Sequence, residues 1–441
     1  MTKAVLSTPC GEIFGIENSD YDEFRGIRYA SAKRWEYPIM TESWDGTYDA
    51  TDFGDCCFQH RAFEEDAKVN PFYHKEFRRN MSFTYSEDCL FLNIFKPKNA
   101  EGCPVLVYIH GGSFTGGSSN EGHISGAQFA RNGIVFVSIN YRLGPFGFCA
   151  HPSLEKDGAC GNFGLYDQLA ALKWINKNIV FFGGDNKNVT LLGQSAGAMS
   201  VDILISSPLC RGLFSKAVMM SGAGLQRAIA RPLSVQKIQP FWEEIMKKAG
   251  ASSMEELRKV DAKTLFYSWR SVCDEDKLKS MMFYTLPIFD GKLVTPETFN
   301  MKSISKMPKL LSVTSEDMLP IILAELVKKW VKRDKKSDCF VYRFSRRLPG
   351  DDKGAWHSSD LPFVFSTLQN GWRPYEKLDY CLSEKMSSSV SAFVKKGDPN
   401  CDGLPLWRPG LKEIMNFGEK IETGKLKMLP FLKATFKNKP F

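Results

Sequence analysis

Short apolar runs separated by polar stretches dominate the first 225 residues of the chain. Residues 104–109 are continuously apolar, and residues 134–139 are apolar except for Ser138, which is typical of strands buried on both faces. Apolar residues recur at helical spacing through 164–178, and this predicts an amphipathic helix. We expect further strands at 90–95, 189–192, 217–222, 309–314 and 339–344. Strands that alternate with helices predict an α/β fold with a mostly parallel, doubly wound sheet.

The start of the chain has a different pattern. Residues 4–6 and 12–16 alternate between apolar and polar around Pro9-Cys10-Gly11, which predicts a hairpin at a sheet edge. Residues 45–81 are irregular and polar, so we expect a long loop there.

Composition excludes several classes of protein. Apolar residues make up 43% of the 441, and no apolar run approaches the roughly 18 residues that a membrane span needs, so no membrane partner is expected. The first residues carry one lysine, with Pro9 and Gly11 where a signal peptide would be apolar, and this favours a cytoplasmic protein. Length alone permits one α/β domain.

Cysteines and charge add two further expectations. The 12 cysteines form no C-x-x-C pairs, so we expect mostly buried thiols in a reducing compartment and no metal site. The net charge is +8, but lysines and arginines are interleaved with 50 acidic residues, and only the tail 412–441 is mildly basic. This distribution favours an ordinary solvated surface and no nucleic acid partner.

The segment Gly193-Gln194-Ser195-Ala196-Gly197 joins a predicted strand to a run of small residues with helical character. A serine at such a sharp turn needs neighbours without bulk two positions away on each side, and both are glycine. The first N–H groups of the following helix favour a negative oxygen beside the hydroxyl. The pattern G-x-S-x-G also occurs by chance, so the rest of the chain has to support a nucleophile here.

A serine nucleophile needs oxyanion donors, a base and an acid. Gly111 and Gly112 follow the apolar strand at 104–109, where their N–H groups could approach a ligand closely. Of the six histidines, His357 is the one that follows the last predicted strand. Glu316 and Asp317 follow the strand before it, in the chain order serine, acid, histidine of α/β-hydrolases. Loops that follow parallel strands meet at one edge of the sheet.

Taken together, these segments resemble the type-B carboxylesterase family, which also contains the cholinesterases. The resemblance covers roughly the first 225 and the last 100 residues, and it is carried by 24–30, 86–95, 110–112, 140–144, 161–168, 182–185, 193–198 and 397–400. It implies an α/β-hydrolase fold and hydrolysis of carboxylic esters. It places the nucleophile at Ser195, the base at His357, and oxyanion donors at Gly111, Gly112 and Ala196.

The resemblance also implies two buried ion pairs, Arg34 with Glu87 and Arg142 with Asp167. Cys57 and Cys89 match the first disulfide of the family, but we expect them to be mainly reduced in a cytoplasmic chain. The family pattern further implies one domain over residues 1–441, with cap-type insertions at about 225–300 and 318–338.

Three departures from the family pattern limit this reading. The family acid is usually glutamate, so the residue type favours Glu316. The position relative to the end of the strand favours Asp317 instead. We prefer Asp317, because the position at the strand end decides where a carboxylate points. The acid and His357 are only forty residues apart, so a reduced helical cap and a more open pocket are expected. Residues 57–89 contain no tryptophan to stack on a quaternary ammonium, which argues against a cholinesterase.

The sequence therefore predicts a serine esterase that hydrolyses uncharged carboxylic esters through an acyl-enzyme on Ser195, with no cofactor and no metal. The predicted partner is a small-molecule ester. An amidase, lactonase or thioesterase could use the same residues, and a binding homologue without catalysis is a further alternative. The sequence leaves the substrate and the oligomeric state open.

Overall fold

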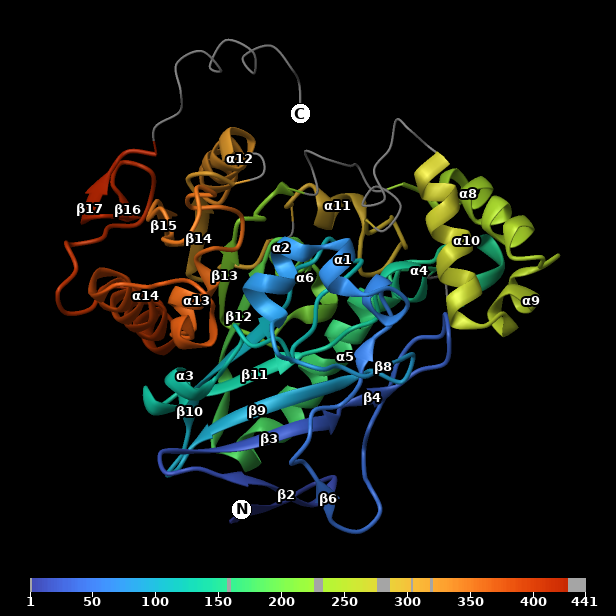
Figure 1. Cartoon of the computed structure of the whole chain (residues 1–441), viewed down its shortest axis with the longest axis horizontal. Helices are drawn as coiled ribbons and strands as arrows, with labels where there is room; N and C mark the ends of the chain where they lie inside the picture. Colours follow the sequence, from blue (N-terminus) through green and yellow to red (C-terminus); the bar gives the residue numbers. More distant parts are fainter. Residues whose placement is uncertain are drawn as a thin grey trace.

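The structure is a computed structural model, and it describes residues 2–156, 160–225, 233–275, 286–302, 304–317 and 320–426. A single large sheet organises these residues (Figure 1). Its strand order is β1-β2-β3-β9-β11-β10-β12-β13-β14-β15-β16-β17, with β6 paired to β2. The strands of this sheet are β1 (Lys3–Thr8), β2 (Gly11–Glu17), β3 (Tyr21–Arg28), β6 (Tyr48–Asp49), β9 (Phe91–Pro97), β10 (Cys103–Ile109), β11 (Val135–Ile139), β12 (Gly184–Gln194), β13 (Lys216–Met220), β14 (Lys309–Thr314), β15 (Cys339–Phe344), β16 (Ile414–Phe417) and β17 (Ile421–Gly424).

The strands from β11 to β16 in this order are parallel to one another. At the edges, β1, β2, β3 and β9 pair antiparallel in turn, β9 is antiparallel to β11, and β17 is antiparallel to β16. The mostly parallel sheet and the hairpin at its edge are thus confirmed. The strands expected at 104–109 and 134–139 lie in its centre as β10 and β11. Parallel strands that all run the same way bring their carboxyl ends, and the loops that follow them, to one edge.

Helices cover both faces of the sheet and create a separate core on each. The side chains of β10 alternate between the two: Val105, Val107 and Ile109 lie in one core, and Leu106 and Tyr108 in the other. The first core contains α5 (Phe163–Asn178), α6 (Ala196–Leu204) and α12 (Pro320–Arg333). The second contains α3 (Ala127–Arg131), α13 (Leu361–Val364) and α14 (Lys377–Lys396).

Helix α12 lies in the segment 318–338, one of the two expected cap-type insertions. It connects β14 to β15, which are parallel neighbours, and it buries Leu323, Val327 and Trp330 in the core beside the sheet. The Nε1 of Trp330 donates a hydrogen bond to Asp202 of α6 at 3.1 Å. The helix is therefore the crossover that a parallel strand pair requires.

A third core lies away from the sheet, under helices α8 (Val235–Lys248), α9 (Met254–Lys259) and α10 (Ala262–Glu275). These helices gather at one end of the molecule (Figure 1) and pack with Trp35, Trp242 and Trp269 around α4 (Gly144–Gly147). They fall within the expected insertion at 225–300, where α11 (Pro296–Phe299) also lies. Residues 226–232 and 276–285 of that region are outside the described residues. The division into one domain with inserted segments stays a prediction.

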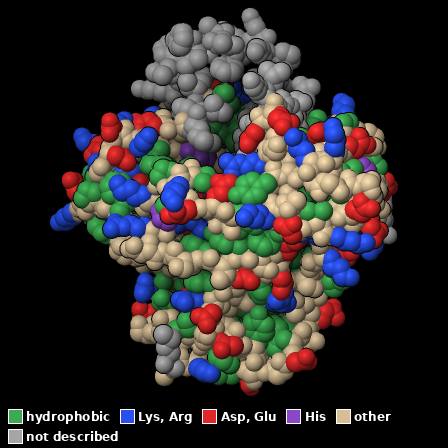
Figure 2. All heavy atoms as spheres, turned by 45° about the vertical axis from the view of Figure 1, so that its right-hand side comes forward, with side chains coloured by type: hydrophobic (Ala, Val, Ile, Leu, Met, Phe, Trp, Pro, Cys, Tyr) green, Lys and Arg blue, Asp and Glu red, His purple; other side chains and the backbone are tan. Residues whose placement is uncertain are grey.

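The irregular segment before β9 forms several short elements: β4 (Ala30–Ser31), β5 (Ile39–Met40), β7 (Cys56–Cys57), α1 (Asp66–Val69), α2 (Pro71–Tyr73), the π-helix His74–Arg78 and β8 (Tyr85–Ser86). In the described part of the chain, no helix is both long and apolar enough to cross a bilayer. Acidic and basic side chains are interspersed over the face that Figure 2 shows. Residues 427–441 of the basic tail are outside the described residues.

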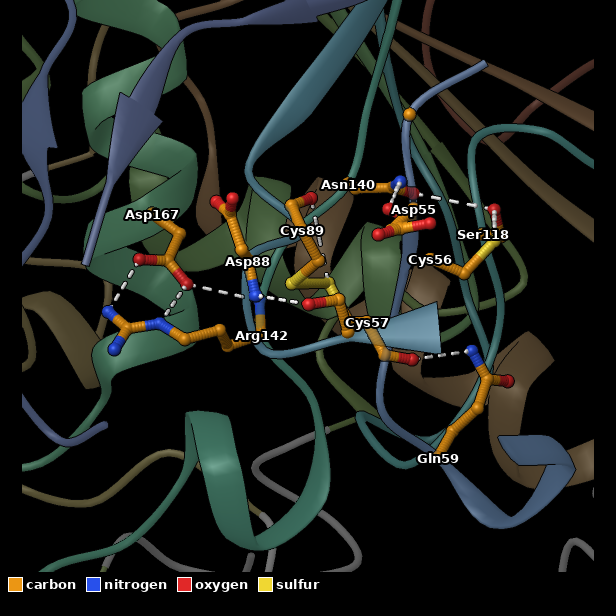
Figure 3. The surroundings of a disulfide bond; sticks show 12 residues. Asp55, Cys56, Cys57, Gln59, Asp88, Cys89, Ser118, Asn140, Arg142 and Asp167 are labelled. Carbon is orange, nitrogen blue, oxygen red and sulfur yellow. Dashed lines mark hydrogen bonds and ion pairs between the residues drawn. A yellow bond between two sulfur atoms is a disulfide. The ribbon is translucent and has the colours of Figure 1, made fainter. Parts of the chain in front are cut away.

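Both expected ion pairs are present, but only the pair of Arg142 with Asp167 is buried, because the side chain of Glu87 is 30% exposed. The Nε of Arg142 lies 2.8 Å and its Nη2 2.7 Å from the carboxylate of Asp167, and both side chains are almost fully buried (Figure 3). The Nε of Arg34 donates to Glu87 at 2.9 Å. Removing one partner of the bidentate pair of Arg142 with Asp167 would leave the other charge buried and uncompensated.

The expectation of reduced thiols is wrong for one pair. Cys57 and Cys89 form a disulfide in the structure, with their Cα atoms 5.0 Å apart (Figure 3). The pairing of β7 with β8 brings the segment of Cys57 next to the start of β9, and this places the two sulfurs within bonding reach. Ten other cysteines are free, and most of them are buried as expected.

Candidate active site

The turn at Ser195 joins the end of β12 directly to the start of α6. Ser195 has φ 56° and ψ −122°, a backbone conformation that L-residues rarely adopt and that active sites often retain. Its N–H donates to the carbonyl of Met220 at 2.8 Å, which holds the turn against β13. A Cβ on Gly197 would lie 2.0 Å from the carbonyl oxygen of Ile109, and one on Gly193 would lie 2.3 Å from Gly197, so only glycine fits at both positions.

The loop after β10 packs against this turn. A Cβ on Gly111 would lie 3.1 Å from the Cβ of Ser195. Gly112 has φ +107°, and a Cβ there would lie 2.1 Å from the carbonyl oxygen of Gly116. The absence of side chains therefore lets the backbone of this loop approach Ser195, while α6 begins on the other side at Ala196. Gly111 and Gly112 thus share the cavity wall with Ser195, and Ala196 directly follows the serine in the chain.

His357 and Asp317 meet although 40 positions separate them. The Nδ1 of His357 lies 2.6 Å from Oδ1 of Asp317, and the two side chains are 6% and 0% exposed. The hydroxyl of Thr314 donates to Oδ2 of Asp317 at 3.0 Å. Burial acts to raise the pKa of Asp317, but the charge and hydrogen bond of His357 and the neighbouring hydroxyls outweigh it, so this pKa lies below its ordinary value. Asp317 is therefore a carboxylate at neutral pH.

The register of two loops explains why Asp317 and not Glu316 meets the imidazole. Beyond β14 and β15, Glu316 and Trp356 form one further parallel bridge, so the next residues, Asp317 and His357, are also neighbours. Successive side chains along extended backbone point to opposite sides. Glu316 accordingly points away, where it accepts the N–H of Ala355 at 2.7 Å and pairs with Arg347.

The other imidazole nitrogen contacts a residue that the sequence did not indicate. Nε2 of His357 lies 3.2 Å from Nε2 of Gln194, and the same Gln194 nitrogen donates to Oγ of Ser358 at 2.8 Å. Among the described residues, the contact of Nε2 is with Gln194 and not with the hydroxyl of Ser195. The only signal in the sequence is the place of Gln194 directly before the proposed nucleophile.

A cavity of about 250 Å³ opens at this point. Ser195, His357, Gln194 and the glycines after β10 line it, together with His60, Arg61, Asn70, Tyr73, Phe77 and Arg78 of the irregular early segment. Tyr108 of β10 and His110, Glu121 and His123 from the chain that follows β10 also line it. The sequence analysis did not assign the irregular early segment to the site. The rings of Tyr73, Phe77 and Trp356 pack together, with every pair of ring centroids no more than 5.8 Å apart. Trp356 directly precedes His357 in the chain.

The charges in the cavity wall are mostly paired. Arg61 donates to Asp66 at 2.8 Å and Arg78 to Glu121 at 2.5 Å. Burial lowers the pKa of His110 and of His123 to about 4, so both are neutral near pH 7. The wall thus offers a substrate aromatic and polar surface without a large excess of one charge.

A second carboxyl lies behind the imidazole. Asp360 is fully buried, and its Oδ2 accepts a hydrogen bond from the hydroxyl of Tyr342 at 3.1 Å. Its Oδ1 has no hydrogen-bond partner among the described residues. Burial, together with the nearby charge of Asp317, raises the pKa of Asp360 to about 7.

This raised pKa predicts a dependence of stability on pH. Between about pH 4 and pH 7 the folded protein keeps a proton on Asp360 that the unfolded chain releases, so the free energy of unfolding decreases as the pH rises through this window. Asp360→Asn removes the ionisation and keeps an acceptor for Tyr342. The variant should therefore gain about 2 to 3 kcal/mol relative to wild type between pH 5 and pH 7, as measured by urea denaturation. The exposed Asp352→Asn is the control, and an equal gain there would contradict the assignment.

The comparisons with known proteins agree with this architecture. The family model described as "Carboxylesterase family" matches residues 2–334 and 321–428. Para-nitrobenzyl esterase of Bacillus subtilis (strain 168) is 29% identical to this chain, and the match covers 96% of each protein. Fumonisin B1 esterase of Sphingopyxis macrogoltabida is 38% identical, and the match covers 96% of this chain and 88% of that protein. A solved PNB esterase superimposes with a TM-score of 0.84 and 25% identity over the full length of both chains. The chain therefore belongs to the carboxylesterase family, a family of carboxylic ester hydrolases with the α/β-hydrolase fold.

Proposed function

We propose that this protein is a serine esterase that hydrolyses carboxylic esters through an acyl-enzyme on Ser195. The observation that carries the proposal is the buried hydrogen bond between His357 and Asp317 beside a strained serine at one cavity. A neutral imidazole that donates from Nδ1 to a carboxylate has its lone pair on Nε2, where it can accept a proton from a hydroxyl.

In the first half of the reaction, Oγ of Ser195 attacks the ester carbonyl carbon while Nε2 of His357 takes the hydroxyl proton. The tetrahedral intermediate then collapses, and the departing alcohol takes that proton from His357. In the second half, His357 takes a proton from water as the water attacks the acyl-enzyme. Collapse of this intermediate releases the carboxylic acid and returns the proton to Ser195.

Two groups of residues stabilise the charges that develop. The N–H groups of Gly111, Gly112 and Ala196 receive the oxyanion, and their fixed positions mean that little reorganisation is needed when the negative charge forms. Asp317 orients the imidazole and stabilises its positive charge. None of these roles requires a metal or an organic cofactor.

We propose that the substrates are small, mostly uncharged esters. The paired charges of the cavity wall favour neutral groups over strongly ionic ones, because a charged group would have to compete with existing ion pairs for its own partners. The aromatic side chains of Tyr73 and Phe77 provide apolar surface for an acyl or alcohol group. A pocket more open than is usual in the family stays part of this proposal.

A panel of matched ester, thioester and amide substrates tests the reaction class. With the same acyl group and similar leaving groups, we expect the ester to have the highest kcat/KM. The amide should be slower by several orders of magnitude, because its leaving group is a much poorer one. An amide or thioester that exceeded the ester would favour the amidase or thioesterase alternative. If the folded protein neither turned over any of the three nor reacted with a fluorophosphonate probe, a binding homologue would replace the esterase.

A further inference from the structure

We propose that Gln194 is a positioning residue that holds the imidazole of His357 in its neutral, proton-accepting form between turnovers. This inference rests on the proposed function of Ser195 and His357, and it concerns a residue to which neither the sequence nor the comparisons gave a role.

Gln194 is the last residue of β12, and it is only 3% exposed. Its amide nitrogen carries two hydrogens, and it has two neighbours within hydrogen-bond distance: Oγ of Ser358 at 2.8 Å and Nε2 of His357 at 3.2 Å. The amide oxygen lies on the opposite side, near Gly111, where an added Cβ would approach it to 2.6 Å. The side chain is thus confined between the loop after β10, which contains Gly111, and the loop that contains His357 and Ser358.

The loop of His357 is shaped to accept this contact. Ser358 has φ 80°, in the left-handed region that a serine rarely occupies. A residue is kept in such a conformation only where its surroundings stabilise it. The hydroxyl that this backbone turns toward Gln194 accepts one amide hydrogen and leaves the other for the imidazole.

The direction of these hydrogen bonds selects the form of His357. An amide N–H can donate to Nε2 only when that nitrogen has a lone pair, and the proton is then on Nδ1, which faces the carboxylate of Asp317. Protonation of Nε2 would turn this contact into two donors facing each other. Gln194 therefore favours the neutral imidazole over the imidazolium.

The same lone pair has to accept the proton of Ser195 during catalysis. Because Nε2 has one lone pair, the hydroxyl of Ser195 and the amide of Gln194 compete for it. The structure represents the state in which Gln194 occupies it. Substrate binding would then require the amide to yield this position while its bond to Ser358 persists.

Other titratable groups also face His357. Asp317 approaches from the loop after β14, Asp360 lies three residues beyond the imidazole, and Tyr73 approaches from α2. Burial raises the pKa of Tyr73 to about 12, so it stays neutral near pH 7. Asp360, with its pKa of about 7, can titrate near neutral pH. Charged or titratable side chains across the cavity are His60, Arg61, Arg78, His110, Glu121 and His123.

The test compares two variants of nearly equal volume, Gln194→Met and Gln194→Glu, over a pH profile of kcat/KM. Methionine removes the donor, so the neutral imidazole loses a hydrogen bond and the midpoint of the acid limb should move to higher pH. Glutamate adds a negative charge that stabilises the imidazolium, so the midpoint should move further, by about one pH unit or more. Repeating both variants in an Asp360→Asn background removes the titration of the neighbouring carboxyl.

Gln168→Met is the matched control. Gln168 is a fully buried glutamine of α5 that donates to Ser200 at 3.1 Å, away from the cavity. This substitution should reduce stability without moving the acid limb. The order wild type, Gln194→Met, Gln194→Glu in the midpoints would support the proposal, and three equal midpoints with a uniformly lower rate would reduce Gln194 to a structural residue.

An NMR titration of the His357 ring protons separates this inference from the proposed function. It should show the same order of midpoints in the folded variants even if no ester were hydrolysed. If the wild type hydrolyses esters but the His357 titration is identical in all variants, the inference fails while the function stands. Folding of each variant is verified by its thermal unfolding.

Discussion

Ser195→Ala should reduce kcat on a p-nitrophenyl ester by about three or more orders of magnitude. In the proposed mechanism, Oγ of Ser195 is the only protein atom that forms a covalent bond to the substrate. Without it, the remaining groups can only stabilise direct attack by water. The turn at Ser195 should persist, because alanine keeps the Cβ and the N–H that bonds to the carbonyl of Met220. The measurement is steady-state kinetics on purified protein, with the burst of p-nitrophenol as a second readout.

Ser207→Ala provides the control for this substitution. Ser207 is a buried serine just beyond α6, outside the cavity, and its loss should leave kcat within a few-fold of wild type. A Ser195→Ala protein that retained a tenth of the wild-type activity would refute the assignment of the nucleophile. In that case another hydroxyl of the cavity wall would have to be sought.

Asp317→Asn and Glu316→Gln form a pair of adjacent, isosteric substitutions with very different expected results. Asparagine at 317 cannot supply the negative charge and can stabilise the wrong tautomer of His357, so kcat should decrease by about three to four orders of magnitude. Glutamine at 316 keeps an oxygen that can accept from the N–H of Ala355, and its loss of the exposed pair with Arg347 should cost less than tenfold. The pH profile and kcat of both proteins decide between the two acids.

The opposite result would show that the acid is Glu316. This would require the loops after β14 and β15 to rearrange by one residue, because the bridge between Glu316 and Trp356 now turns their following residues toward each other. Full activity in both variants would instead indicate that the imidazole is oriented without a carboxylate.

The largest features of the fold could be predicted because they depend on local patterns. Apolar runs predicted β10 and β11, and the amphipathic run at 164–178 predicted α5, since each buries its own apolar side chains against a neighbour. The pair of glycines around Ser195 likewise indicated a turn that no bulkier residue could form. The chain order of the parallel strands then brought the loops of Ser195, Asp317 and His357 to one edge of the sheet.

Other features depend on which segments meet, and no local pattern records that. Residues 318–338 have the same helical pattern whether they cover a pocket or cross over between two strands, and only the pairing of β14 with β15 shows that α12 is a crossover. The disulfide of Cys57 and Cys89 depends on a distance between two backbone segments. The early segment that carries Tyr73 and Phe77 lines the cavity through packing over residues distant in sequence.

The sequence by itself determined the order of strands and helices, the strained turn at Ser195 and the set of residues from which a triad could form, because these follow from periodicity, from glycine geometry and from chain order. The sequence favoured Asp317 by its register but left Glu316 open, and the tertiary structure shows that Asp317 contacts His357. Only the tertiary structure shows that Gln194 contacts the other imidazole nitrogen. The physical reason is the direction in which side chains point. Successive side chains on extended backbone point to opposite sides, so a register shift of one residue decides which carboxylate reaches the imidazole.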